Sequence, residues 1–125
     1  MEDINTLYCF YNLALDYFEL GNIEDARELC EDIYERIGRL KNAREYYELY
    51  LAEGLLSKIY GRLGMRDVSL KMAKEAYEGA KRLLGDSNDN TILLLQELIL
   101  LYGDFGENKK ALEYIEILKK YTDIE

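Results

Sequence analysis

The stretch LALDYFELGNIEDA, from Leu13 to Ala26, decides the fold of this chain of 125 residues. Its central Gly21 has counterparts at Gly64 and Gly106, which follow at spacings of 43 and 42 residues. Around each glycine stand a leucine eight positions before, a tyrosine four before and a small residue five after: Leu13, Leu56, Leu98, Tyr17, Tyr60, Tyr102, Ala26, Ser69 and Ala111. Self-similarity at a fixed period of this size is typical of stacked supersecondary units.

The residues on both sides of Gly21 have helical periodicity. Apolar residues between Leu7 and Tyr17, and again between Ile23 and Ile37, recur at i, i+3 and i+4. The chain has no proline, which would break a helix, and it is rich in strong helix formers. Gly21 can adopt the left-handed conformation that ends many helices. The unit is therefore predicted to be an antiparallel helical hairpin.

Applied to all three glycines, this pattern predicts one domain over 1–125, an all-α solenoid of three hairpins and six helices. The units cover about 4–40, 42–84 and 88–122. Asn42 is the predicted N-cap of the second unit, and the turn-rich run 85–90 separates it from a helix that starts near Thr91. The last helix is expected to end at Tyr121.

The repeated residues are predicted to hold the hairpins together. Small side chains at Ala26, Ser69 and Ala111 would let the paired helices approach closely, and the leucine eight before each glycine would be buried. Cys30 matches apolar positions in the other units, so we expect a buried core thiol.

Composition excludes several functions. The chain carries 25 acidic and 16 basic residues, a net charge of −9, with no dense basic cluster to neutralise phosphates. It lacks histidine, so a zinc site has too few ligands, and we expect no metal or cofactor. No phosphate-binding loop and no nucleophile with a base is present, which argues against an enzyme. Without a basic N-terminal region or a long apolar run, we expect neither nucleic acid nor membrane as a partner and a cytoplasmic location.

The run from Leu13 to Ala26 resembles the tetratricopeptide repeat, in which a leucine, a tyrosine, a turn glycine and a small residue occur in this order. The third unit is similar, whereas the second departs from the pattern after Gly64. The period is longer than the usual 34 residues and is similar to that of kinesin light chain repeats, which also have the Leu84-Gly85-Asp86 type of loop. The resemblance implies a protein-interaction module.

In a stack of such hairpins the first helices line the concave side. The residues expected to be exposed there form an apolar, aromatic groove for a partner's helix or peptide: Tyr8, Tyr11, Leu15, Phe18, Leu51, Lys58, Arg62, Leu93, Gln96 and Leu100. Glycines on the predicted face, such as Gly54, indicate close helix packing or room for a ligand. Some tetratricopeptide proteins bind a peptide's terminal carboxylate with a clamp of polar residues on this surface. The present chain departs from that pattern, because apolar residues interrupt it.

Two other hypotheses remain open from the sequence. The groove could be filled by the chain itself or by a second copy, which would make the protein a homo-oligomeric scaffold. Alternatively, the protein could be a regulatory sensor that binds a small peptide or ligand in the groove. Because the last helix is apolar where a terminal repeat is normally polar, Tyr114, Ile117 and Tyr121 are the predicted self-association residues.

Overall fold

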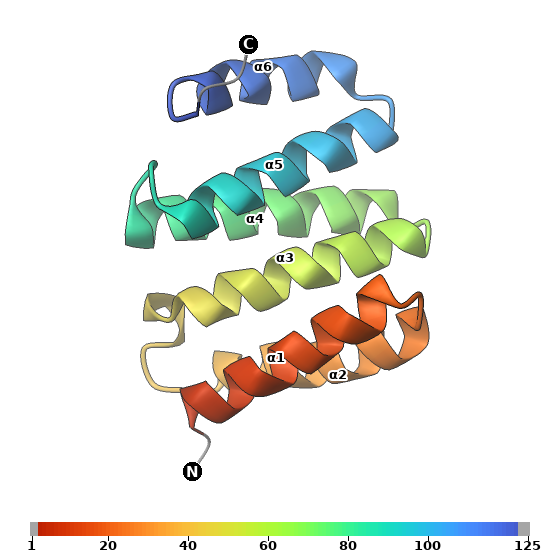
Figure 1. The fold of residues 1–125 in the computed structure, drawn as a ribbon, viewed down its shortest axis with the longest axis vertical. Coiled ribbons are helices and arrows are strands. Elements are labelled where there is room, and N and C mark those ends of the chain that lie inside the picture. Colours follow the sequence, from red (N-terminus) through yellow and green to blue (C-terminus); the bar gives the residue numbers. More distant parts are fainter. Residues whose placement is uncertain (1–2, 123–125) are drawn as a thin grey trace.

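The structure is a computed structural model, and it describes residues 3–122. Within that range six α-helices follow one another: α1 (Ile4–Glu19), α2 (Ile23–Gly38), α3 (Tyr47–Arg62), α4 (Arg66–Leu84), α5 (Asp89–Asp104) and α6 (Asn108–Lys119), with a 3₁₀ turn η1 (Ala43–Glu45) before α3. Helices α1, α3 and α5 lie on the near side of Figure 1, and α2 and α4 lie behind them. The predicted all-α solenoid of helical hairpins is confirmed.

Each hairpin reverses at its glycine in the same way. At Gly21 φ is 86°, a left-handed value that a β-carbon would disfavour. The amide of Asn22 then donates to the carbonyl of Tyr17 at 2.8 Å, and the amide of Gly21 donates to Phe18 at 3.1 Å. Equivalent long bonds run from Met65 to Tyr60 and from Glu107 to Tyr102. These paired bonds satisfy the last carbonyls of each first helix.

The small residues allow close approach, as the sequence predicts. Ala26 and Ser69 are fully buried, and Ala111 is 8% exposed. The serine that replaces alanine in the second unit has a hydrogen-bond partner, because its Oγ donates to the carbonyl of Ser57 at 2.6 Å. At Gly54 a β-carbon would lie 2.5 Å from Cδ2 of Leu94, so α3 and α5 approach closely there.

Neighbouring hairpins share one continuous core. Helix α2 packs against α3, and α4 packs against α5, so that each second helix covers the first helix of the next hairpin. The largest buried side chains come from all three hairpins: Leu7, Ile33, Ile37, Tyr50, Leu55, Leu56, Ile59 and Leu98. Cys30 is fully buried, as predicted, and its Sγ lies 3.4 Å from the carbonyl of Ala52. Burial raises the pKa of this thiol.

The predicted start of α3 was wrong, and two other helix boundaries differ from the prediction by two residues. Asn42 adopts a left-handed φ of 60° and makes no side-chain cap, so it opens η1, and α3 begins only at Tyr47. Asparagine tolerates this conformation better than most residues, which is why it favours a turn here. Helix α5 starts at Asp89 instead of Thr91, because the Asn88 side chain accepts a bond from the amide of Asn90 at 2.9 Å. The last helix ends at Lys119, two residues before the expected position.

The expectation that all three repeat leucines are buried was wrong for one of them. Leu56 is 1% exposed and Leu98 is 0% exposed, but Leu13 is 42% exposed. The reason lies in the order of the stack, since Leu56 and Leu98 are covered by the hairpin that precedes each of them. Among the described residues no hairpin precedes α1.

Candidate protein-interaction groove

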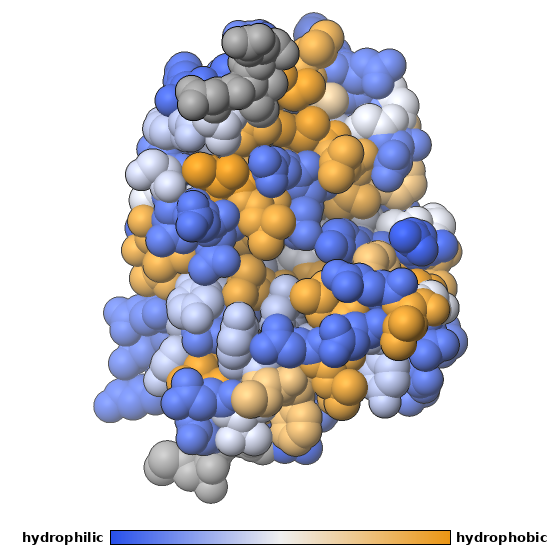
Figure 2. Space-filling model, viewed as in Figure 1, coloured by the Kyte–Doolittle hydropathy of each residue, from blue (hydrophilic) through white to orange (hydrophobic). Residues whose placement is uncertain are grey.

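A pocket of about 590 Å³ opens among α1, α3 and α5, the first helices of the three hairpins. Six of the ten residues that the sequence places in the groove line it: Phe18, Lys58, Arg62, Leu93, Gln96 and Leu100. We refer to this pocket as the groove. Figure 2, in the orientation of Figure 1, shows apolar and hydrophilic side chains side by side across α3 and α5.

The apolar part of the groove consists of leucines that face solvent. Leu93 is 42% exposed and Leu100 is 65% exposed, although both belong to a helix whose other leucines are buried. They lie seven residues apart, two turns of α5, so both stand on one face of the helix. Exposed apolar residues that gather in a concavity mark interaction sites more often than single exposed leucines do.

The polar part of the groove surrounds Phe18. The Nζ of Lys58 lies 5.3 Å from the centre of the Phe18 ring, and the guanidinium carbon of Arg62 lies 5.0 Å from it. Lys58 also forms an ion pair with Glu97, with Nζ and Oε2 at 2.9 Å and both side chains mostly buried. This pair joins α3 to α5 and neutralises the lysine. Among residues 3–122 Arg62 makes no ion pair, so its charge is available to a partner.

The remaining predicted groove residues lie outside the pocket. Tyr8 and Tyr11 stack with ring centres 5.9 Å apart on α1, and burial, with a contribution from Glu97, raises the pKa of Tyr11. Leu15 is half-buried against the core. The expectation that Leu51 is exposed was wrong, because it is only 6% exposed and belongs to the buried core. The same expectation was wrong for Phe18, which lines the pocket but is only 9% exposed.

Sequence reasoning missed several groove residues, among them Glu97, Asp104 and Phe105. Phe105 directly precedes the turn glycine Gly106. The sequence could have indicated Glu97, because its negative charge complements that of Lys58 at a similar height on the adjacent first helix. Asp104 carries no such signal. The groove is therefore more polar than the apolar, aromatic trough that the sequence predicts.

The predicted self-association residues differ in their surroundings. Tyr114 stacks on Tyr102, with ring centres 5.6 Å apart, and meets Tyr77 edge-on at 6.1 Å. Ile117 is partly buried against the core, and Tyr121 is 38% exposed. Much of the aromatic surface of α6 thus packs within the same molecule.

One buried carboxyl group lies away from the groove. Glu53 on α3 is 5% exposed and accepts a hydrogen bond from the Tyr34 hydroxyl at 3.2 Å. Burial, together with the nearby Glu75 carboxylate, raises the pKa of Glu53 to about 7. Within 3–122 no cluster of three metal-ligating side chains occurs, so this pair lacks the further ligand that a metal ion would need.

Replacing Glu53 with glutamine should stabilise the fold at pH 8 by on the order of 1 kcal/mol and have little effect near pH 5. The folded carboxyl keeps its proton up to about pH 7, whereas a free one loses it near 4.5, so folding becomes less favourable as pH rises through this interval. Glutamine has no charge to bury. Urea unfolding at both pH values measures the effect, with the exposed Glu28→Gln as control. An equal gain at both pH values would contradict the assignment.

Comparison with known proteins gives this geometry a family context. Residues 6–40 match the model of the tetratricopeptide repeat. The first hairpin is therefore a tetratricopeptide repeat. No curated protein matches the sequence. The nearly identical TPR-like repeats of a putative kinesin light chain from Podosopora anserina, known from a crystal structure, are similar to this chain. The TM-score is 0.80 and the sequence identity 20%, over 94% of this chain and 56% of that one. A single-substitution variant of the same repeats has a TM-score of 0.79 and 20% identity, over 94% of this chain and 55% of the variant.

The predicted resemblance to tetratricopeptide repeats is thus confirmed, and at this identity the solved structures show the shared fold. The chain spans little more than half the length of those structures. Tetratricopeptide repeats generally mediate protein–protein interactions and are typically not enzymes. Among the helices described, none combines the length and apolar character needed to cross a membrane.

Proposed function

We propose that this tetratricopeptide-like array is a protein-interaction module that binds a segment of a partner protein in the groove. The observation that carries the proposal is the pair of solvent-facing leucines, Leu93 and Leu100, in a pocket of about 590 Å³ on the inner helices. Their exposure has no role in stabilising the core. A partner that covers them gains the free energy of apolar burial, roughly 25 cal/mol per Å² before the costs of association are subtracted.

The chemistry of the groove suggests what the partner offers. The exposed leucines match apolar side chains on one face of a helix or on alternate positions of an extended segment. Arg62 adds a positive charge without an ionic partner among the described residues, so a carboxylate beside the apolar anchors would complement it. The expected ligand is an apolar segment with an acidic residue next to it.

Selection of a random 16-residue peptide library on the immobilised chain tests the proposal. Enriched peptides should carry apolar anchors, and their affinity, measured by fluorescence anisotropy, should fall at least about tenfold in Leu100→Asp. Arg62→Glu should weaken acidic peptides more than their amidated forms. The charge reversal Lys71→Glu, on the exposed side of α4, is the matched control and should leave binding unchanged. Failure to enrich any peptide, or equal binding by all three variants, would contradict the groove as the site.

A further inference from the structure

The first helix leaves an apolar stripe uncovered. Phe10 and Leu13 on α1 are 46% and 42% exposed, and Tyr17 beside them is only half-buried. The matching positions of α5 are Leu95, Leu98 and Tyr102, which are 2%, 0% and 8% exposed. The difference arises because α4 packs on α5, whereas nothing described packs on the same face of α1. The α1 stripe therefore has the shape and chemistry of a surface that receives the second helix of another hairpin.

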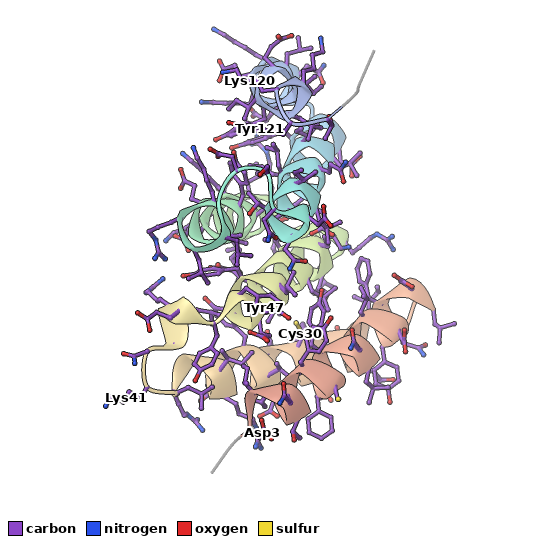
Figure 3. The ribbon with its side chains drawn as sticks, turned by 60° about the vertical axis from the view of Figure 1, so that its left-hand side comes forward. Asp3, Cys30, Lys41, Tyr47, Lys120 and Tyr121 are labelled. Carbon is purple, nitrogen blue, oxygen red and sulfur yellow. The ribbon has the colours of Figure 1, made fainter. Side chains whose placement is uncertain are left out.

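The last helix presents the complementary surface. Positions of α2 and α4 that face the next hairpin include Cys30 and Ala73, both buried. The matching residue of α6 is Ile115, which is partly exposed, and its neighbour Leu112 is 62% exposed. Figure 3 shows Lys120 and Tyr121 at one end of the stack and Asp3 at the other. The two uncovered faces thus lie at opposite ends of the molecule.

We infer that these two ends bind each other between copies, so that α6 of one molecule packs on α1 and α2 of the next and continues the stack head to tail. The contact would repeat the packing of α2 on α3 and of α4 on α5. This inference is independent of the groove, because the uncovered residues Phe10, Leu13 and Leu112 are not among those that line it.

The repeat register assigns specific contacts to this interface. Inside the molecule, the Tyr60 hydroxyl donates to Glu31 on the preceding hairpin at 2.5 Å. The residues at the same positions of the two ends are Tyr17 on α1 and Glu116 on α6. The same bond can therefore form between copies, while Leu112 and Ile115 cover Leu13.

Charge favours the same arrangement. A shallow pocket of about 390 Å³ beside the α1 stripe is lined by Leu13, Tyr17, Asp25, Glu28, Leu29 and Asp32. The end of α6 carries Lys119 and Lys120. Inside the molecule, Tyr34 contacts Glu53 and lies near Glu75 on the next hairpin. In the repeat register, Lys119 occupies the position of Tyr34, and Asp32 occupies the position of Glu75. Lys119 of one copy is thereby directed to Asp32 of the next.

The present partners of these charges do not prevent the contact. Lys119 pairs with Glu116 on α6 at 3.3 Å, and Asp32 pairs with Arg36 on α2 at 2.9 Å. The side chains of both pairs are exposed. Exposed pairs of this kind contribute little and exchange partners readily. Because the two surfaces differ, each added copy leaves a new end open, so the assembly grows without a fixed size.

Sedimentation velocity on the full chain tests the inference. The weight-average sedimentation coefficient should rise with concentration up to about 0.5 mM, without a plateau at the dimer. Leu13→Asp blocks one end and Leu112→Asp the other, and each variant alone should remain monomeric. Both leucines are exposed, so both variants should fold, which circular dichroism checks. An equimolar mixture still has one intact pair of ends and should form dimers only.

A charge exchange examines the predicted register. Asp32→Lys and Lys119→Asp should each weaken association at least about tenfold, and the double variant should restore it. The groove variant Leu100→Asp should associate like the wild type, which separates this inference from the proposed function. A wild type that stays monomeric at 0.5 mM would overturn the inference and leave the stripe to some other occupant. A mixture of the blocked variants that stays monomeric, or a wild-type dimer that neither variant disrupts, would overturn it as well.

Discussion

Replacing Leu98 with alanine should lower the free energy of unfolding by about 2–5 kcal/mol. Leu98 is 0% exposed and lies in the core where α4 covers α5. Truncation removes its transfer free energy and leaves a cavity that the surrounding helices can only partly close. Urea unfolding followed by circular dichroism at 222 nm measures the change, and a loss of this size should lower the melting temperature by several degrees.

Leu13→Ala is the matched control, because Leu13 occupies the same position of the repeat. Its 42% exposure means that much less apolar area is lost, so the cost should stay below about 1 kcal/mol in the monomer. Comparable losses at the two positions would show that α1 is covered in solution. No loss at Leu98 would contradict the packing of the third hairpin on the second.

These two leucines also show how far the sequence predicts the fold. The turn glycines and the small residues after them depend on contacts within one hairpin, so the period alone predicts their roles correctly. Burial of the leucine depends on the neighbouring hairpin as well. A pattern that is identical in Leu13 and Leu98 therefore cannot show which of them lies at the end of the stack.

The groove was predicted only in part for a related reason. Helical spacing shows which residues share a face, and six of the ten predicted residues do line the pocket. Spacing does not show how far neighbouring helices close over a face, and Leu51 is buried for that reason. Nor does it reveal a pair such as Lys58 with Glu97, which joins residues 39 positions apart. The start of α3 is a further feature that local sequence did not predict. The preference of Asn42 for a turn is local, but whether the chain continues from it into a helix depends on where α3 packs.

Replacing Gly79 with alanine should destabilise the fold by about 2–4 kcal/mol, although alanine is the better helix former. Gly79 lies on α4, and a β-carbon there would overlap the Tyr50 ring carbons Cε1 and Cδ1. The ring has little freedom to move: Tyr50 is 2% exposed, its hydroxyl donates to the carbonyl of Arg44 at 2.8 Å, and Arg82 donates to that hydroxyl at 2.7 Å. The variant must shift the ring and strain or lose both bonds, each worth about 1 kcal/mol.

Gly103→Ala provides the matched control for this clash. Gly103 also lies inside a helix, but a β-carbon there would meet nothing within 4 Å, so the substitution should stabilise by about 0.5–1 kcal/mol through helix propensity alone. The two alanine variants should thus change stability in opposite directions in the same urea titration. Combining Gly79→Ala with Tyr50→Leu should cost less than the sum of the two single substitutions, because the smaller side chain leaves room for the new methyl group. If Gly79→Ala were as stabilising as Gly103→Ala, Tyr50 could not occupy the space beside α4, and the contact between α3 and α4 at this level would have to be different.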